Sequence, residues 1–140
     1  MRFQEVEPAR PLLVDFDYDA GLRAELRSAV RAAGVETAWV TGTGALREAE
    51  IGVYDQDDYE VHTVRYDEPL EMPGFAGTIT TDGDGIDVQV RGVLARPSGQ
   101  ALAGRLVSAT VFGGQALVRG FEEPIDRETD AATGMDRLAL

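Results

Sequence analysis

The chain has 140 residues, 44% of them hydrophobic, which is the size and composition of one folded domain. It contains no cysteine, which excludes disulfides, cysteine–zinc sites and thiol nucleophiles. No signal-peptide core or membrane-length apolar run is present, so we expect a cytoplasmic protein without membrane contact. We expect a single domain over residues 1–140, with a core at about 11–121 and a polar tail with a short terminal strand over 122–140.

Charge is the strongest global signal. The sequence has 25 acidic and 13 basic residues, every basic residue is arginine, and the net charge is −12. An acidic surface without lysine is typical of proteins that work in concentrated salt, which predicts a halophilic source; GC-rich coding bias is the alternative. Net charge bears on solubility and binding rather than on fold. Because DNA affinity depends on arginine and lysine contacts to phosphates, and no basic run is present, direct DNA binding is disfavoured.

One helix is predicted near the N-terminus, after a first strand over residues 11–17. Apolar residues recur at helical spacing from Leu22 to Ala33. Asp17 or Asp19 precedes them as a candidate N-cap, and Gly34 follows as a C-terminal stop signal.

The rest of the chain mostly alternates apolar and polar residues, which predicts strands. The expected strands cover residues 35–40, 49–54, 59–65, 75–81, 86–95, 106–112 and 115–121. The expected turns lie at Gly42–Gly44, Asp55–Asp58, Asp82–Gly85 and Pro97–Gly99. One helix followed by a run of strands indicates an α+β fold with a mainly antiparallel sheet.

Two local motifs suggest ligand sites that their spacing does not support. Gly42-Thr43-Gly44 follows a strand, as phosphate-binding loops do, but lacks the third glycine and the helix of a dinucleotide-binding fingerprint. Asp82, Asp84 and Asp87 gather carboxylates as a calcium loop would, but they miss the EF-hand spacing. We therefore expect structural turns at both places.

His62 is the only histidine and lies in the middle of a predicted strand. One histidine without cysteine cannot build a zinc site with three nitrogen ligands in one chain. General base catalysis remains an alternative, but no serine or cysteine motif accompanies it, so a histidine on the strand surface is favoured.

Glu71 lies between Leu70 and Met72, in a stretch that we expect to be buried. A buried carboxylate needs a partner, so we expect Glu71 to meet an arginine or backbone donors. Carboxylates in such surroundings gather at functional sites, which makes Glu71 a candidate site residue.

Gln89, Arg91 and Arg105 form a fourth constellation. If the turn at Pro97–Gly99 pairs the strands on either side, the three side chains can converge on one face of the sheet. Their partner is then a carboxylate such as Glu71, a neighbouring subunit, or a bound anion that matches the planar guanidinium group. Ion pairs at a subunit interface and a ligand site made of Gln89, Arg91, Arg105 and Glu71 both remain open.

The order of several pieces resembles the plant-and-prokaryote-conserved (PPC) domain family over residues 11–140. The pieces are PLLVDFDYDAGLRAELRSAVRAAGV, TAWVTGTGALREAEIGVYD, YDEPLEMPGFAGTIT, VQVRGVLARPSGQALAGRLVSATVFGGQALV and DAATGMDRLAL. The resemblance implies an α+β antiparallel fold, a homotrimer, and a fold similar to that of acetolactate decarboxylases, which hold zinc with three histidines. Glu71 matches an acidic position that the family often has.

This sequence departs from the family at the implied metal ligands. Gln89 and Arg91 replace a His-x-His pair, and Arg105 replaces the histidine of a Gly-Gly-His-Leu piece. Arginine stays protonated and glutamine binds zinc weakly, so we expect no metal and no other cofactor.

Three functions follow from the resemblance. The first is a non-catalytic homotrimer, a candidate DNA-associated regulatory or protein-interaction module whose partner is another protein, since no AT-hook motif is present. The second is a trimer that binds small anions, in which guanidinium charge replaces metal charge. An enzyme related to acetolactate decarboxylase is the least favoured, because the histidines are missing.

Overall fold

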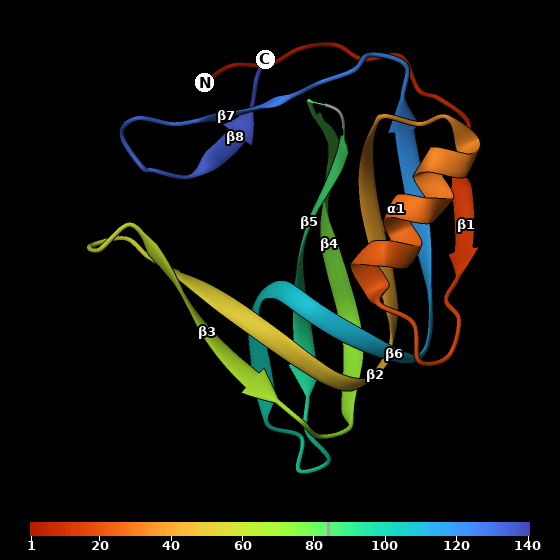
Figure 1. Cartoon of the computed structure of the whole chain (residues 1–140), viewed down its shortest axis with the longest axis vertical. Helices are drawn as coiled ribbons and strands as arrows, with labels where there is room; N and C mark the ends of the chain where they lie inside the picture. Colours follow the sequence, from red (N-terminus) through yellow and green to blue (C-terminus); the bar gives the residue numbers. More distant parts are fainter. Residues whose placement is uncertain (84) are drawn as a thin grey trace.

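The computed structural model describes residues 1–83 and 85–140 and arranges them as one helix and eight strands (Figure 1). The helix is α1 (Leu22–Ala33). The strands are β1 (Leu12–Asp15), β2 (Thr37–Asp55), β3 (Glu60–Tyr66), β4 (Leu70–Asp82), β5 (Gly85–Ala95), β6 (Ala101–Phe121), β7 (Arg127–Thr129) and β8 (Asp136–Leu138). All pairings between these strands are antiparallel, which confirms the predicted mainly antiparallel sheet with a single helix.

The main sheet closes on itself. Its strand order is β1-β6-β5-β4-β2-β3, and β2 also pairs with β6 from Thr37–Phe121 to Gly52–Arg105. Strands β2, β4, β5 and β6 therefore form a ring with an inner and an outer face. The buried apolar residues fill the inside of this ring, and in β5 they alternate with outward-facing residues, as Val88, Val90 and Leu94 show.

Helix α1 covers a gap in the ring. Strands β5 and β6 pair only from Arg91–Arg105 to Ala95–Ala101 and separate beyond this point. Leu22, Leu26 and Val30 of the helix are fully buried there, because their helical spacing places them on one face.

Two arginines on the same helix bind the edges of the separated strands. The Arg23 Nε donates to the carbonyl oxygen of Val88 (3.0 Å), and its Nη1 donates to that of Val107 (3.1 Å). The Arg27 Nε donates to the carbonyl oxygen of Ile86 (2.9 Å). The helix thereby supplies the hydrogen bonds that the strands do not give one another.

The predicted N-cap of this helix is wrong. The N-cap residue is Gly21, which has no side chain to cap with, and neither Asp17 nor Asp19 takes that place. Asp19 has a positive φ of 67° in the turn between β1 and α1, and its carboxylate pairs with Arg47. The predicted C-terminal stop is confirmed, since Gly34 adopts a left-handed conformation (φ 69°).

The predicted turn at Gly42–Gly44 is also wrong, because β2 continues through it with a bulge. A Cβ on Gly42 would lie 2.4 Å from the ring of Phe75, and one on Gly44 would lie 2.4 Å from the carbonyl oxygen of Gly113. These glycines therefore allow close packing within a sheet. The two strands expected at 106–112 and 115–121 are likewise one long strand, β6.

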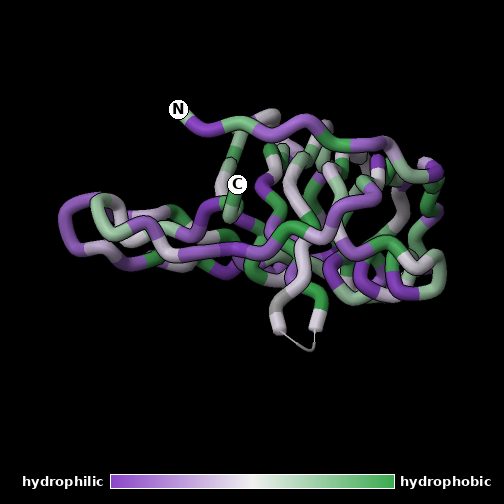
Figure 2. The backbone as a smooth tube through the Cα atoms, turned by 90° about the horizontal axis from the view of Figure 1, so that it is seen from above, coloured by the Kyte–Doolittle hydropathy of each residue, from purple (hydrophilic) through white to green (hydrophobic). Residues whose placement is uncertain are grey.

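The C-terminal strands β7 and β8 form a separate hairpin, and several side-chain bonds hold it against the rest of the chain. The Arg127 Nε lies 3.0 Å from Asp87 Oδ2, and the Tyr54 hydroxyl donates to the carbonyl oxygen of Thr133 (2.6 Å). The C-terminal hairpin and the tip of the β2–β3 hairpin accordingly lie on the same side of the molecule, away from the helix (Figures 1 and 2).

The expected Asp82–Gly85 turn includes Asp84, which lies outside the described residues. In the part of the chain that is described, no helix has the length and apolar character needed to cross a membrane.

Candidate functional site

Arg91 and Arg105 lie directly opposite one another where β5 pairs with β6. Directly paired residues of neighbouring strands share a face, so both side chains lie on the outer face of the ring. Gln89 lies two residues before Arg91 and therefore shares this face. The structure thus brings together three of the four residues that the sequence singled out.

A hollow of about 310 Å³ lies beside Arg105 and Gln89, with Val61, Thr63 and Val107 among its walls. Gly52 pairs with both Arg105 and Thr63. A Cβ at Gly52 would lie 2.6 Å from Val61 and 3.2 Å from Val107, so the missing side chain lets these walls approach.

Asp87 is the acidic residue that lines this hollow, and its charge is already compensated. Its carboxylate accepts a hydrogen bond from Gln89 Nε2 (2.9 Å) and forms ion pairs with Arg127 (3.0 Å) and Arg23 (3.7 Å). Among the residues that the structure describes, neither Arg91 nor Arg105 has an ion pair or a side-chain hydrogen bond. Like charges directly opposite one another destabilise a sheet, so a counter-charge beside this pair would stabilise it.

Glu71 does not join the arginine pair, and the expectation that it is buried and bound by an arginine or by backbone donors is wrong. It is exposed on β4, opposite Ala45 and Ala95, and lines a different hollow of about 560 Å³. Its neighbours Leu70 and Met72 face the core, so the period of two along a strand points Glu71 outward.

The residues at the implied metal position do not fit a zinc ion. Arg91 and Arg105 carry fixed positive charges, and the remaining residue, Gln89, offers only an amide oxygen, which binds zinc weakly. We therefore derive no metal-dependent step from this position.

Asp55, Asp58 and His62 form a cluster at the β2–β3 tip that sequence analysis did not find. Their candidate ligand atoms lie within 4.8 Å of one another. The backbone amides of Asp58 and Asp57 donate to the Asp55 carboxylate and lower its pKa, so its main role is to hold the turn. His62 is exposed on the strand surface, as predicted. The three residues lie within eight positions of the chain, on the end of β2, the turn and β3, and the hairpin pairing of Val53 with His62 brings them together.

Among the residues that the structure describes, a broad part of the outer face carries no acidic side chain, although the chain has 25 acidic residues. Two neighbouring rows of paired residues cross β6, β2, β4 and β5, and β1 adds Leu13 at the edge. We call this surface the Trp39 face: Leu13, Trp39, Thr41, Ala76, Thr78, Gln89, Arg91, Leu117 and Arg119. Leu13 is 85% exposed and Trp39, the only tryptophan, is 45% exposed.

A ring of antiparallel strands with one helix over its gap defines a small α+β class of protein. The sequence profile of the Plants and Prokaryotes Conserved (PCC) domain, here abbreviated PPC, matches residues 3–121. The chain therefore belongs to this family.

Solved structures agree with this assignment. A metal-containing protein of Archaeoglobus fulgidus shares 27% identity over all of both chains, with a TM-score of 0.93. A PPC protein of Pyrococcus horikoshii shares 20% identity over 96% of each chain, with a TM-score of 0.88. A candidate DNA-binding protein of Ralstonia eutropha shares 22% identity over 91% of this chain and 90% of that one, with a TM-score of 0.83.

Acetolactate decarboxylase of Bacillus subtilis is a more distant neighbour, with 9% identity and a TM-score of 0.53 over 87% of this chain and 56% of that one. This likeness shows a related fold, as the sequence resemblance implied. Among curated proteins, no sequence matches this chain.

Proposed function

We propose that the chain forms a cytoplasmic homotrimer that acts as a non-catalytic regulatory or protein-interaction module, associated with DNA through another protein. The observation that carries this proposal is the Trp39 face. It combines exposed apolar side chains with arginines, and no acidic residue of residues 1–83 and 85–140 belongs to it, in a chain of net charge −12. Exposed apolar patches of this kind mark protein contacts.

The charge of this face suits contact between copies. Two surfaces of a strongly acidic protein repel one another unless the contacting areas carry few carboxylates. Tryptophan and arginine are enriched at protein interfaces. In a cyclic trimer, each interface joins two different surfaces of the chain. Arg91 of one copy would therefore contact a different surface of the next copy, and not its own counterpart.

A direct role on DNA has less support from the residues. The net charge of −12 repels phosphates, and most arginines with a partner are bound to carboxylates of the same chain. The likeness to a candidate DNA-binding protein therefore suggests association through a partner.

Light scattering on the purified protein tests the assembly. We expect three times the 15.1 kDa mass of the chain. Trp39→Glu, which places a carboxylate on the Trp39 face, should give monomers. Val53→Glu is the matched control, because Val53 is also an exposed apolar residue of β2 but lies outside this face. A monomeric wild type, or equal loss of mass in both variants, would contradict the proposal.

A second candidate function is binding of a small carboxylate or phosphate at Gln89, Arg91 and Arg105. It is favoured by the arginine pair, which has no carboxylate partner among the described residues. Guanidinium groups bind such anions through paired hydrogen bonds.

A thermal-shift series with phosphate and small dicarboxylates tests this candidate at fixed KCl. A ligand at a hundred times its dissociation constant adds about 2.7 kcal/mol of apparent stability. Arg91→Ala with Arg105→Ala should abolish the shift, whereas Arg10→Ala with Arg31→Ala should retain it. A shift that survives the first pair of substitutions would exclude this site.

A further inference from the structure

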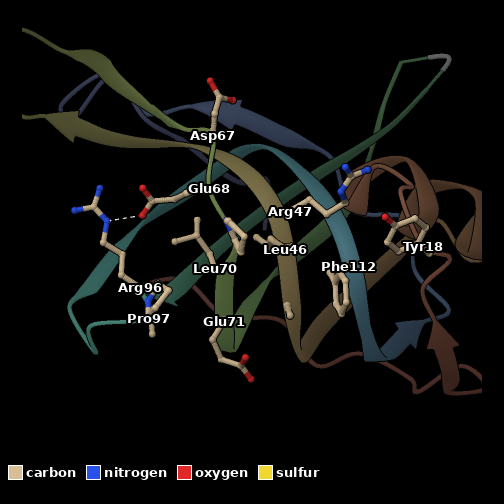
Figure 3. A pocket seen from close by; sticks show the side chains of 13 residues that line it. Tyr18, Leu46, Arg47, Asp67, Glu68, Leu70, Glu71, Arg96, Pro97 and Phe112 are labelled. Atoms are coloured by element: carbon tan, nitrogen blue, oxygen red, sulfur yellow. Dashed lines mark hydrogen bonds and ion pairs between the residues drawn. The ribbon is translucent and has the colours of Figure 1, made fainter.

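The hollow beside Glu71 has the size and lining of a small-molecule site and belongs to neither proposal above. Its volume of about 560 Å³ lies in the range of ligand pockets. Tyr18 and Phe112 stand on one side of it and Pro97 and Leu70 on the other, with Glu71 at the edge (Figure 3). The rings of Tyr18 and Phe112 meet edge to face, with centroids 5.8 Å apart.

The two arginines that line this hollow are already neutralised. Arg47 pairs with Asp19 and lies over the ring of Tyr18, 5.4 Å from its centroid. Arg96 pairs with Glu68 (2.6 Å) and lies 5.1 Å from the centroid of the Tyr66 ring. Neither guanidinium is therefore free to attract an anion.

Of the three carboxylates that line the hollow among the described residues, two are bound by arginines and one is not. Glu68 is bound by Arg96, and Asp67 is bound by Arg65 at 2.7 Å. Within the described part of the chain, Glu71 is the lining charge that has no ion pair and no hydrogen bond. The hollow thus offers one uncompensated negative charge beside an apolar, aromatic wall.

We propose that this hollow binds a small organic cation with an apolar body, such as a primary amine on an aromatic or aliphatic group. The ammonium group lies against the Glu71 carboxylate, where a charge-assisted hydrogen bond forms. The apolar body lies between Phe112 and Pro97, and the exposed ring of Phe112 favours a nearby positive charge. The net charge of −12 also raises the local concentration of cations.

Three phenylalkyl probes that differ in charge test the charge preference. Calorimetric titration at the lowest salt that keeps the protein folded would compare phenethylammonium, 2-phenylethanol and 3-phenylpropionate. We expect phenethylammonium to bind most tightly and the anion most weakly. Equal binding of the three probes, or no binding of the ammonium, would overturn the proposal.

Two variants then test the location. Glu71→Gln should weaken phenethylammonium binding about tenfold or more, the loss expected for a hydrogen bond to a charged group. It should leave 2-phenylethanol binding unchanged, and Phe112→Ala should weaken both. Glu60→Gln, an exposed residue on β3, is the control and should change neither. If Glu71→Gln binds phenethylammonium as the wild type does while circular dichroism shows the same fold, the site is not here.

Discussion

Arg23 joins the two edges of the ring where β5 and β6 separate, and its removal should therefore lower the stability of the protein. Arg23→Met keeps much of the apolar stem but removes the donors to the carbonyl oxygens of Val88 and Val107. Both carbonyls lie where β5 and β6 separate, so no neighbouring strand replaces the lost bonds.

The expected loss in the free energy of unfolding follows from the two hydrogen bonds that the charged Arg23 guanidinium donates. Each contributes about 1.5–3 kcal/mol when intact. The Arg23 side chain is 34% exposed, so water compensates part of the loss. We therefore expect the free energy of unfolding to fall by about 2 kcal/mol, which lowers Tm by about 8 °C for a domain of this size.

Urea unfolding at fixed KCl and fixed protein concentration measures this change. Arg31→Met on the same helix is the control, since Arg31 is exposed and has no side-chain partner among the described residues. It should cost about 0.5 kcal/mol or less. Equal losses in the two variants, or none in Arg23→Met, would refute the view that Arg23 joins the two strands.

Three further predictions concern packing, pH and salt. Gly77→Ala should destabilise the protein by about 3 kcal/mol in urea unfolding, because the new Cβ would lie 2.0 Å from the carbonyl oxygen of Gln89. Gly74→Ala on the same strand, where nothing lies within 4 Å, should be tolerated. The lowered pKa of Asp55 stabilises the β2–β3 turn above the ordinary aspartate value of 3.8, and this contribution should fade as pH falls through the lower, folded value. NMR amide shifts of Asp57 and Asp58 should report that titration in the wild type but not in Asp55→Asn. Because of the net charge of −12, Tm should rise between about 0.2 and 2 M KCl, since the screening length shortens and the repulsion between carboxylates weakens. A Tm that does not change with KCl would remove the support for a halophilic origin.

Two of the turns between strands were predictable from the sequence. The Asp55–Asp58 turn joins β2 to β3, and the Pro97–Gly99 turn joins β5 to β6. This second turn places Arg91 opposite Arg105, so the core of the candidate site followed from one hairpin.

Closure of the sheet was not predictable from local pattern. Gly42 and Gly44 look like turn residues, and only the contacts with Phe75 and Gly113 explain them as close-packing positions within a strand. The Trp39 face depends on pairings between β2, β4, β5 and β6, which are far apart in the chain. Glu71 is a different case, because the alternation of Leu70 and Met72 could have placed it outside the core.

The central claim is that other copies of the chain cover the Trp39 face, and acrylamide quenching of Trp39 fluorescence tests it most directly. Trp39 is the only tryptophan, and in the single chain it is 45% exposed. We expect weak quenching and blue-shifted emission in the wild type, and strong quenching in Thr41→Glu, which places a carboxylate beside Trp39 on the same face. Strong quenching of the wild type under conditions where light scattering finds a trimer would show that the copies meet elsewhere.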